Sequence, residues 1–332
     1  METNMAVVSL AQQMKRQHEA RLLSMSNVVA IGVGLKIAGN VQTNEPCVVV
    51  SVVKKLPVIQ LSESSLIPKI LGGVKTDVIE TGKIFALQDP TQKMRPARPG
   101  VSIGHYQITA GTLGCLVQRN GQVYILSNNH VLANSNAGQL GDAVLQPGPH
   151  DGGTSADKIG TLEQFIPVAL EGRSSPGCSP LSFLMRLFGK SARAMINEPG
   201  NNTVDCAIAK PLSDDLVNPD ILHIGIPTGV GIATLGTPVQ KSGRTTGYTA
   251  DQITQIDVTV TVDYGGPTAT FKNQLMAGAM SKGGDSGSVV LDMNKQVVGL
   301  LFAGSNTTTI MNPIQFVLDA LQVQLITAEN PT

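Results

Sequence analysis

Short apolar runs separated by glycine-rich turns occupy the chain from residue 101 to about residue 310. Typical runs are QVYILSN, VDCAIAK, QITQIDVTVTV and QVVGLLFAG. Runs of this length suit strands better than helices, and the 332-residue chain has 35 glycines and 19 prolines to form the turns between them. The pattern therefore predicts a mainly β structure, a barrel or a sandwich, in this part of the chain.

The first 88 residues follow a different pattern. Apolar residues in 7–25 recur at a loosely helical spacing, and two β-rich runs follow at 28–37 and 47–56. A further strand is expected within 74–87. We predict a small α/β domain over 1–88.

A proline-rich polar segment, QDPTQKMRPARPG, follows this domain. Such a composition is typical of extended connections, so residues 89–100 are predicted to be a linker. The β-rich domain then covers 101–326 and closes with an amphipathic helix in NPIQFVLDALQVQL, where Asn312 and Pro313 suit the start of a helix.

An insertion at about 171–202 interrupts the strand pattern. Its centre, PLSFLMRLFGK, is strongly apolar with basic residues beside it. Three interpretations stay open: a helix packed on the barrel, a lid over a cleft, or a surface that docks a partner.

Charge and composition exclude several classes of function. The formal net charge is zero and no dense lysine and arginine patch stands out, so no nucleic-acid binding is expected. No apolar stretch is long enough to span a bilayer. At the N-terminus the basic residues follow the short apolar run, the wrong order for a secretory signal, so we expect a cytoplasmic protein.

The four cysteines, Cys47, Cys115, Cys178 and Cys206, form no CxxC pair and no metal-ligand spacing with histidines. We interpret them as buried or half-buried thiols. No metal and no cofactor is predicted.

The segment SKGGDSGSVVLD (281–292) has the features of a turn that presents a nucleophile. A serine attacks well only when a base removes its proton and its oxygen is accessible. Glycines on both sides of Ser286 allow a sharp turn in which the N–H groups of Gly284 and Ser286 converge as an oxyanion hole. Taken alone, the segment also fits an ordinary glycine-rich turn before a strand.

Two further segments supply a base and an acid. His130 follows an apolar strand in YILSNNHVLA, and Asp205 lies among apolar residues in NTVDCAIAK. An acid in an apolar strand needs hydrogen bonds, which the imidazole of a base would provide. Taken alone, His130 also fits a structural histidine.

The order His130, Asp205, Ser286 is that of chymotrypsin-like enzymes. Together with LSNNHVL, VDCAIA, GGDSGSVV and KSGRTTGYTADQI, it resembles the trypsin-like peptidase superfamily, nearest to the bacterial α-lytic protease and streptogrisin branch, over roughly residues 105–310. The resemblance implies a double β-barrel with the triad between the barrels, and peptide-bond hydrolysis through an acyl-enzyme.

The resemblance also implies supporting residues. Asp285 should pair with a buried cation, with Lys241 the first candidate and Arg244 the second. The list of implied pocket residues is Met280, Phe302, Ala303 and Gly304. Because Met280 stands about where trypsin has an acid, and no Asp or Glu lies between positions 274 and 284, we expect an apolar or small residue before the cut, not Lys or Arg.

Several cysteines of the exported relatives are missing. Val131, Gln240, Ala250 and Met280 stand at or near positions where those relatives have cysteines. The absent disulfides support a reducing interior. The N-terminal domain is then expected to be retained for regulation or assembly.

Three functions remain in view: a regulated serine endopeptidase, a catalytically silent scaffold on the same fold, and an esterase that uses the same triad. The expected partner is a protein or peptide substrate. A homo-oligomer or a partner protein could use the N-terminal domain or the 171–202 insertion.

Overall fold

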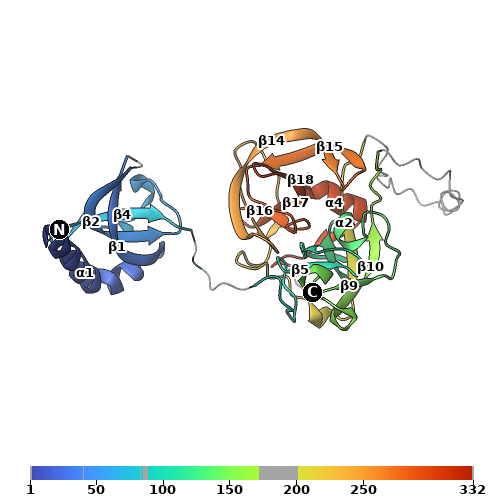
Figure 1. Ribbon diagram of the computed structural model, residues 1–332, viewed down its shortest axis with the longest axis horizontal. Helices are drawn as coiled ribbons and strands as arrows, with labels where there is room; N and C mark the ends of the chain where they lie inside the picture. The colour runs from blue at the N-terminus through green and yellow to red at the C-terminus, as the bar shows by residue number, and fades with distance from the viewer. Residues whose placement is uncertain (1, 40, 83, 85–88, 172–200, 331–332) are drawn as a thin grey trace, which may run out of the picture. The chain divides into compact units, whose positions relative to one another are not determined.

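The computed structural model describes residues 2–39, 41–82, 84, 89–171 and 201–330. The chain divides into two compact units, Met1–Leu87 (unit 1) and Gln88–Thr332 (unit 2) (Figure 1). Among the described residues, no helix is both long enough and apolar enough to cross a membrane.

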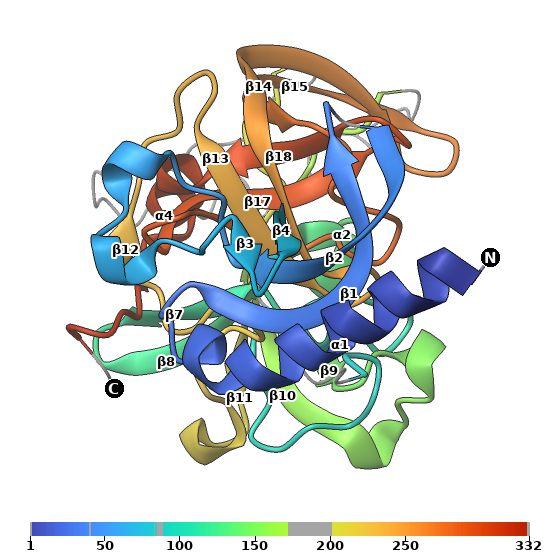
Figure 2. The ribbon, with the colours of Figure 1, turned by 90° about the vertical axis from the view of Figure 1, so that its left-hand side faces the viewer.

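Unit 1 is a four-stranded sheet with one helix. Its elements are α1 (Glu2–Leu23), β1 (Val28–Ala38), β2 (Val41–Val52), the 3-10 turns η1 (Val58–Gln60) and η2 (Glu63–Ser65), β3 (Ile70–Leu71) and β4 (Val74–Glu80). The strand order is β1-β2-β4-β3, with β1 and β2 antiparallel and β2 and β4 parallel. Figure 2 shows α1 lying across β1. Because Ala11 and Met14 of α1 pack with Val48 and Val50 of β2, unit 1 has a hydrophobic core of its own.

The strands of unit 2 form two sheets. The first contains, in spatial order, β19 (Gln324–Leu325), β7 (Cys115–Arg119), β8 (Gln122–Ser127), β11 (Ala207–Pro211), β10 (Lys158–Phe165), β9 (Ala143–Leu145), β5 (Ser102–His105) and β6 (Gly111–Thr112). The second contains β12 (Gly229–Val230), β17 (Gln296–Gly304), β16 (Val289–Asp292), β13 (Pro238–Gly243), β14 (Gly247–Asp263), β15 (Thr268–Ala277) and β18 (Thr309–Pro313).

The second sheet closes on itself. Strand β18 pairs with β15 on one side and with β17 on the other, so six strands form a barrel. Among the described residues, unit 2 also contains α2 (Asn129–Leu132), α4 (Ile314–Leu321) and the 3-10 turns η3 (Pro149–Asp151), η4 (Ser155–Asp157) and η5 (Asp214–Leu216).

A shared core joins the two sheets of unit 2. Cys115 and Leu126 of the first sheet belong to the same buried cluster as Val289 and Leu300 of the second, and Val317 of α4 completes it. The predicted fold class is confirmed: the protein is mainly β, with two curled sheets typical of the chymotrypsin fold, an N-terminal helix-plus-sheet region and a short C-terminal helix.

The segment 89–100, predicted as a linker, belongs to unit 2. The Ala97 side chain is fully buried, its N–H donates to the Leu216 carbonyl at 2.7 Å, and its carbonyl accepts from the N–H of Asn218 at 2.9 Å. An extended, proline-rich sequence is equally suited to a tether and to a strand-like segment on a barrel, so composition did not separate the two.

The described residues on either side of the insertion lie beside β15. Glu171 forms a bridge with Thr268, and Asn202 forms one with Phe271. Residues 172–200, predicted as a helix, a lid or a partner surface, lie outside the described residues.

Candidate active site

Strand pairing brings His130 and Asp205 together. In the antiparallel pair of β8 and β11, Ser127 lies opposite Ala207. His130 follows three residues after Ser127, and Asp205 precedes Ala207 by two residues, so both side chains leave the pair at the same end. The amide of Asn128 fixes this end, because its Nδ2 donates to the Asp205 carbonyl at 2.8 Å.

The imidazole of His130 and the carboxylate of Asp205 form a close polar pair. Nδ1 of His130 lies 2.7 Å from Oδ2 of Asp205, and the His130 N–H donates to Oδ1 at 3.3 Å. Asp205 is fully buried, whereas the His130 side chain is 21% exposed. This contact selects the tautomer with the proton on Nδ1, so the Nε2 lone pair is free to take a proton.

The environment of Asp205 favours the carboxylate. Burial by itself would raise the pKa of this group, but the charge of His130 and hydrogen bonds from His130 and Tyr264 outweigh it, and the pKa lies below the usual value. The hydroxyl of Tyr264 donates to Oδ2 at 2.7 Å. Sequence reasoning missed Tyr264, whose only signal was the need of a buried acid for further donors.

Ser286 lies next to the segment that carries His130. Both segments meet at Gly111, where a Cβ atom would stand 2.4 Å from Val131 Cγ2 and 3.0 Å from the Ser286 carbonyl oxygen. The Thr112 N–H donates to this carbonyl at 2.8 Å.

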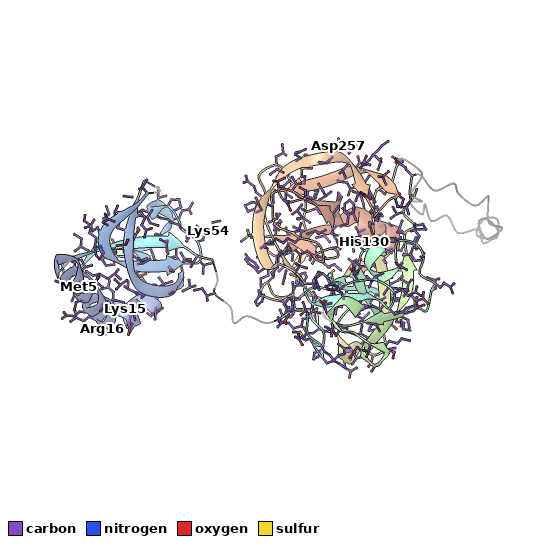
Figure 3. The ribbon with its side chains drawn as sticks, viewed as in Figure 1. Met5, Lys15, Arg16, Lys54, His130 and Asp257 are labelled. Atoms are coloured by element: carbon purple, nitrogen blue, oxygen red, sulfur yellow. The ribbon has the colours of Figure 1, made fainter. Side chains whose placement is uncertain are left out.

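The side chain of Ser286 is turned toward the Phe302 carbonyl. Its Oγ lies 3.5 Å from the Phe302 carbonyl, and among the described residues it makes no hydrogen bond with His130. Catalytic hydrogen bonds are often long or misaligned before substrate binds. Figure 3 marks His130 in unit 2.

The turn around Ser286 depends on glycine. Gly284 and Gly287 have φ of +96° and +95°, and a Cβ on Gly287 would stand 2.1 Å from Ser127 Oγ. Among the described residues, neither the Gly284 N–H nor the Ser286 N–H has a hydrogen-bond acceptor. These two predicted oxyanion-hole donors are therefore available to a ligand.

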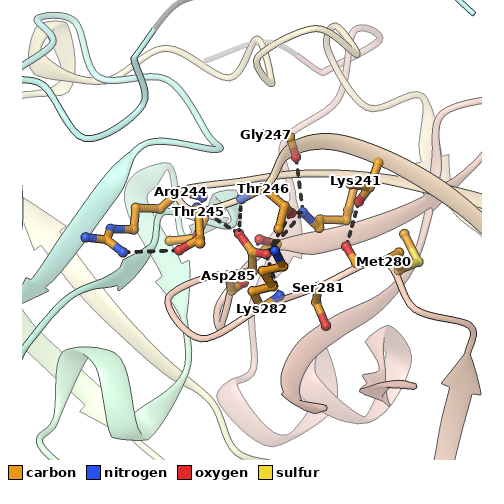
Figure 4. Close-up of polar contacts among 12 residues, drawn as sticks. Lys241, Arg244, Thr245, Thr246, Gly247, Met280, Ser281, Lys282 and Asp285 are labelled. Carbon is orange, nitrogen blue, oxygen red and sulfur yellow. Dashed lines mark hydrogen bonds and ion pairs between the residues drawn. The ribbon is translucent and has the colours of Figure 1, made fainter. Parts of the chain in front are cut away.

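Asp285 is anchored beneath the turn, as Figure 4 shows. Its carboxylate lies 3.4 Å from Lys241 Nζ, and both side chains are fully buried. Oδ1 accepts from the N–H groups of Thr245 and Thr246 at 2.9 and 3.1 Å, and Oδ2 accepts from the Lys282 N–H at 2.9 Å. These contacts tie the residue before Ser286 to the turn after β13 and to Lys282.

Burial of the ammonium group lowers the pKa of Lys241 below its usual value, although Asp285 opposes this effect. The Nζ group also donates to the Thr246 hydroxyl and, at 3.1 Å, to the Gly247 carbonyl. In the described part of the chain, the polar contacts of this buried cation come from Thr246, Gly247 and Asp285.

Arg244, the second candidate for the cation of Asp285, has another partner. Its Nε donates to Asp151 Oδ2 at 2.7 Å, and its guanidinium points away from Asp285 (Figure 4). Arg244 lies one residue beyond β13, where the chain faces the first sheet, and its N–H donates to Thr112 Oγ1 at 3.0 Å. Arg244 therefore joins the two sheets of unit 2.

A cavity of about 630 Å³ opens beside Ser286. Three of the predicted pocket residues, Met280, Ala303 and Gly304, line it. The full list also contains Thr246, Thr249, Ala279, Ser281, Lys282, Gly283, Leu301, Ser305 and Asn306. No carboxylate lines this cavity among the described residues, and Lys282 is the charged group at its wall.

Phe302 differs from the prediction. Its side chain is 3% exposed and packs with Phe271 in a separate cluster. Side chains alternate between the faces of a strand, so Leu301 and Ala303 of β17 face the cavity while Phe302 faces away. Its carbonyl, not its ring, approaches Ser286.

No protein-family model matches the chain, and no curated protein matches it in sequence. Solved structures do match. Protease A of Thermobifida fusca shows 20% identity with a TM-score of 0.47, covering 69% of this chain and 98% of that chain. A chymotrypsin of Cellulomonas bogoriensis shows 21% identity with a TM-score of 0.44, covering 69% and 98%. The Nocardiopsis protease shows 18% identity with a TM-score of 0.47, covering 69% and 99%. The chain is thus similar to chymotrypsin-fold bacterial proteases over about 69% of its length and has an extra N-terminal region.

Proposed function

We propose that this protein is a serine endopeptidase that hydrolyses peptide bonds through an acyl-enzyme intermediate. The observation that carries the proposal is the 2.7 Å contact between His130 Nδ1 and the buried carboxylate of Asp205. It leaves Nε2 of His130 able to act as a base, and the segment that carries His130 meets that of Ser286 at Gly111. Among the described residues, the N–H groups of Gly284 and Ser286 have no acceptor.

In the first half-reaction, Ser286 Oγ attacks the carbonyl carbon of the scissile bond while His130 Nε2 takes the hydroxyl proton. The oxygen of the tetrahedral intermediate accepts hydrogen bonds from the N–H groups of Gly284 and Ser286. The C–N bond breaks as His130 returns the proton to the leaving amine. A water molecule then repeats the sequence on the acyl-enzyme, and Asp205 stabilises the imidazolium in both halves.

The substrate class follows from the cavity beside Ser286. Met280, Leu301 and Ala303 supply apolar wall, and Lys282 adds a positive charge. We propose that the residue before the cut is apolar or small and that Lys and Arg are disfavoured by like charge.

One observation favours a second candidate. Ser286 Oγ is turned toward the Phe302 carbonyl. A scaffold protein without catalysis would keep this orientation, whereas an enzyme would turn Oγ toward His130 when substrate binds.

A fluorophosphonate probe separates these functions, because it reacts only with an activated serine. We expect covalent labelling of the intact protein and no labelling of Ser286→Ala. Ser213→Ala, which removes an exposed serine hydroxyl elsewhere, should label normally. Peptide turnover should fall by about 10⁴–10⁶ in Ser286→Ala. Absence of labelling in the folded wild-type protein would favour the scaffold, and turnover of esters but not peptides would favour an esterase.

We further propose that unit 1 stays attached to unit 2 as a regulatory or assembly domain in a reducing cytoplasm. Support comes from the separate core of unit 1 and from Cys47, Cys115 and Cys206, which are buried free thiols. Intact-mass measurement of the purified protein should give the full 332-residue chain. A stable species that starts between residues 88 and 100 would refute the retention of unit 1.

A further inference from the structure

Two donors meet at one oxygen of Asp205. Oδ2 lies 2.7 Å from His130 Nδ1 and also 2.7 Å from the hydroxyl of Tyr264. The carboxylate is fully buried, and its other oxygen receives, among the described residues, only the longer bond from the His130 N–H at 3.3 Å. Tyr264 is therefore the one side chain besides His130, among the described residues, that donates to this carboxylate.

Tyr264 is held firmly at the tip of the β14–β15 hairpin. Its N–H donates to the Pro267 carbonyl at 2.9 Å, which closes the turn. Just before it, Asp263 Oδ1 accepts from the N–H groups of Gly265 and Gly266 at 2.8 and 2.9 Å. The turn thus fixes the tyrosine backbone without help from the triad.

Aromatic neighbours fix the ring of Tyr264. It stacks on Phe271, with centroids 6.4 Å apart and an angle of 27° between the planes. It meets the imidazole of His130 edge-on, with centroids 6.0 Å apart and an angle of 79°. Phe271 is fully buried and packs against Phe302 at 4.7 Å. The ring therefore has little freedom to leave Asp205.

The electrostatics keep this hydrogen bond in one direction. Burial and the negative charge of Asp205 both raise the pKa of Tyr264 well above the usual value. The phenol is therefore a neutral donor throughout the range in which a peptidase of this class works. A neutral donor stabilises a buried carboxylate without competing with His130 for its charge as a second cation would.

We infer that Tyr264 is a positioning residue of the active site, which holds the Asp205 carboxylate ionised and aimed at His130 Nδ1. Its effect on turnover rests on the proposed peptidase function, but its effect on the His130–Asp205 hydrogen bond does not. The sequence around Tyr264, DYGGP, contains no motif that would predict this role.

The test uses Tyr264→Phe in the full chain, which keeps the stacked ring and removes only the hydroxyl. Tyr248→Phe is the matched control, because Tyr248 lies on β14, the strand that leads to Tyr264, and its hydroxyl contacts Gln240 of β13 at 3.2 Å. With rates normalised to the fraction of protein labelled by fluorophosphonate, we expect Tyr264→Phe to lower kcat by about tenfold or more with little change in KM. The acid limb of kcat/KM should move to higher pH. Without the hydrogen bond from Tyr264, the negative charge of the Asp205 carboxylate is less neutralised and stabilises the protonated form of His130 more strongly. An unchanged kcat and an unchanged pH profile would overturn the inference.

A second measurement does not depend on activity. In proton NMR of the wild-type protein, the Tyr264 hydroxyl proton should exchange slowly with water and show a nuclear Overhauser effect to the His130 Nδ1 proton. The Nδ1 resonance should shift in Tyr264→Phe and stay in place in Tyr248→Phe. The inference would be overturned if the Tyr264 hydroxyl proton exchanged rapidly with water, or if the His130 Nδ1 resonance did not shift in Tyr264→Phe. If these signals behave as expected but fluorophosphonate never labels the protein, the proposed function fails and the role of Tyr264 in holding Asp205 stands.

Discussion

Lys241 and Asp285 form an ion pair with no solvent exposure, 3.4 Å from Nζ to Oδ2, directly below the turn that carries Ser286. The N–H groups of Thr245 and Thr246, from the turn after β13, and of Lys282 also donate to this carboxylate. The cation that orders this turn is thus an internal side chain. We therefore predict that the proposed oxyanion hole takes its shape without proteolytic cleavage of the chain.

Lys241→Met should disrupt the turn. Breaking a buried ion pair by removing one partner leaves an uncompensated charge and costs about 3–5 kcal/mol. We expect a matching loss in the free energy of unfolding, measured with denaturant, and a loss of fluorophosphonate labelling even at temperatures where the protein stays folded.

The double variant Lys241→Met with Asp285→Asn is the control, because it removes both charges. It should recover much of the lost stability, since no single buried charge is left. Full labelling of Lys241→Met would contradict the assignment of Lys241 as the partner of Asp285.

The ion pair between Asp151 and Arg244 should make the free energy of unfolding depend on pH. Asp151 is 6% exposed; burial would raise its pKa, but the hydrogen bonds from Arg244 prevail and the pKa lies below the usual value. Because the folded-state pKa is depressed, the ion pair stabilises the protein above the ordinary value of about 3.9 and loses this effect as pH falls toward the folded-state value. Asp151→Asn should lower the free energy of unfolding by about 3 kcal/mol at pH 6. Once the pH has fallen to the folded-state pKa of Asp151, the same substitution should lower it by almost nothing.

The matched control for Asp151→Asn is Asp220→Asn. Asp220 accepts from Arg98 at 2.7 Å but is 40% exposed, so its loss should cost less than about 1 kcal/mol at either pH. Equal costs for the two variants at pH 6 would show that Arg244 and Asp151 do not join the sheets as we describe.

Site residues that stand in a characteristic short segment could be predicted from the sequence, whereas a residue brought to the site by strand pairing could not. Ser286 and His130 each stand in a short segment whose local pattern points to a turn or a strand end. Tyr264 does not, because it reaches Asp205 from 59 positions away along the chain, and only the pairing of β14 with β15 brings it there. A motif search has no means to detect such a contact.

The direction in which a side chain points also could not be predicted from the sequence pattern. Lys241 directly precedes the SGRTTG run and Arg244 lies within it, but only Lys241 belongs to β13, where its side chain is fully buried. Phe302 was expected in the pocket because its segment passes beside it, yet the alternation of β17 turns the ring away. A one-residue difference in register decides such cases.

Gly287→Ala should unfold the turn at Ser286. A Cβ there would meet Ser127 Oγ at 2.1 Å and the Thr112 carbonyl at 2.4 Å, and φ is +95°. The strain should cost at least about 3 kcal/mol in the free energy of unfolding. Gly283→Ala, four positions earlier, has no atom within 4 Å of the new Cβ and should be nearly neutral. Similar losses for both variants in thermal unfolding would refute the steric argument.

Lys282→Glu should change the preference for the residue before the cut. The wall of the cavity beside Ser286 has no carboxylate among the described residues, and Lys282 is its charged group. Reversing this charge replaces repulsion of a substrate arginine by attraction, which should raise kcat/KM for arginine relative to leucine peptides by about tenfold at low salt. The gain should shrink as ionic strength rises. Lys210→Glu makes the same change of charge at an exposed site on β11 and should leave the ratio unchanged. A ratio that moves equally in both variants would mean that overall charge, and not the cavity beside Ser286, sets the preference.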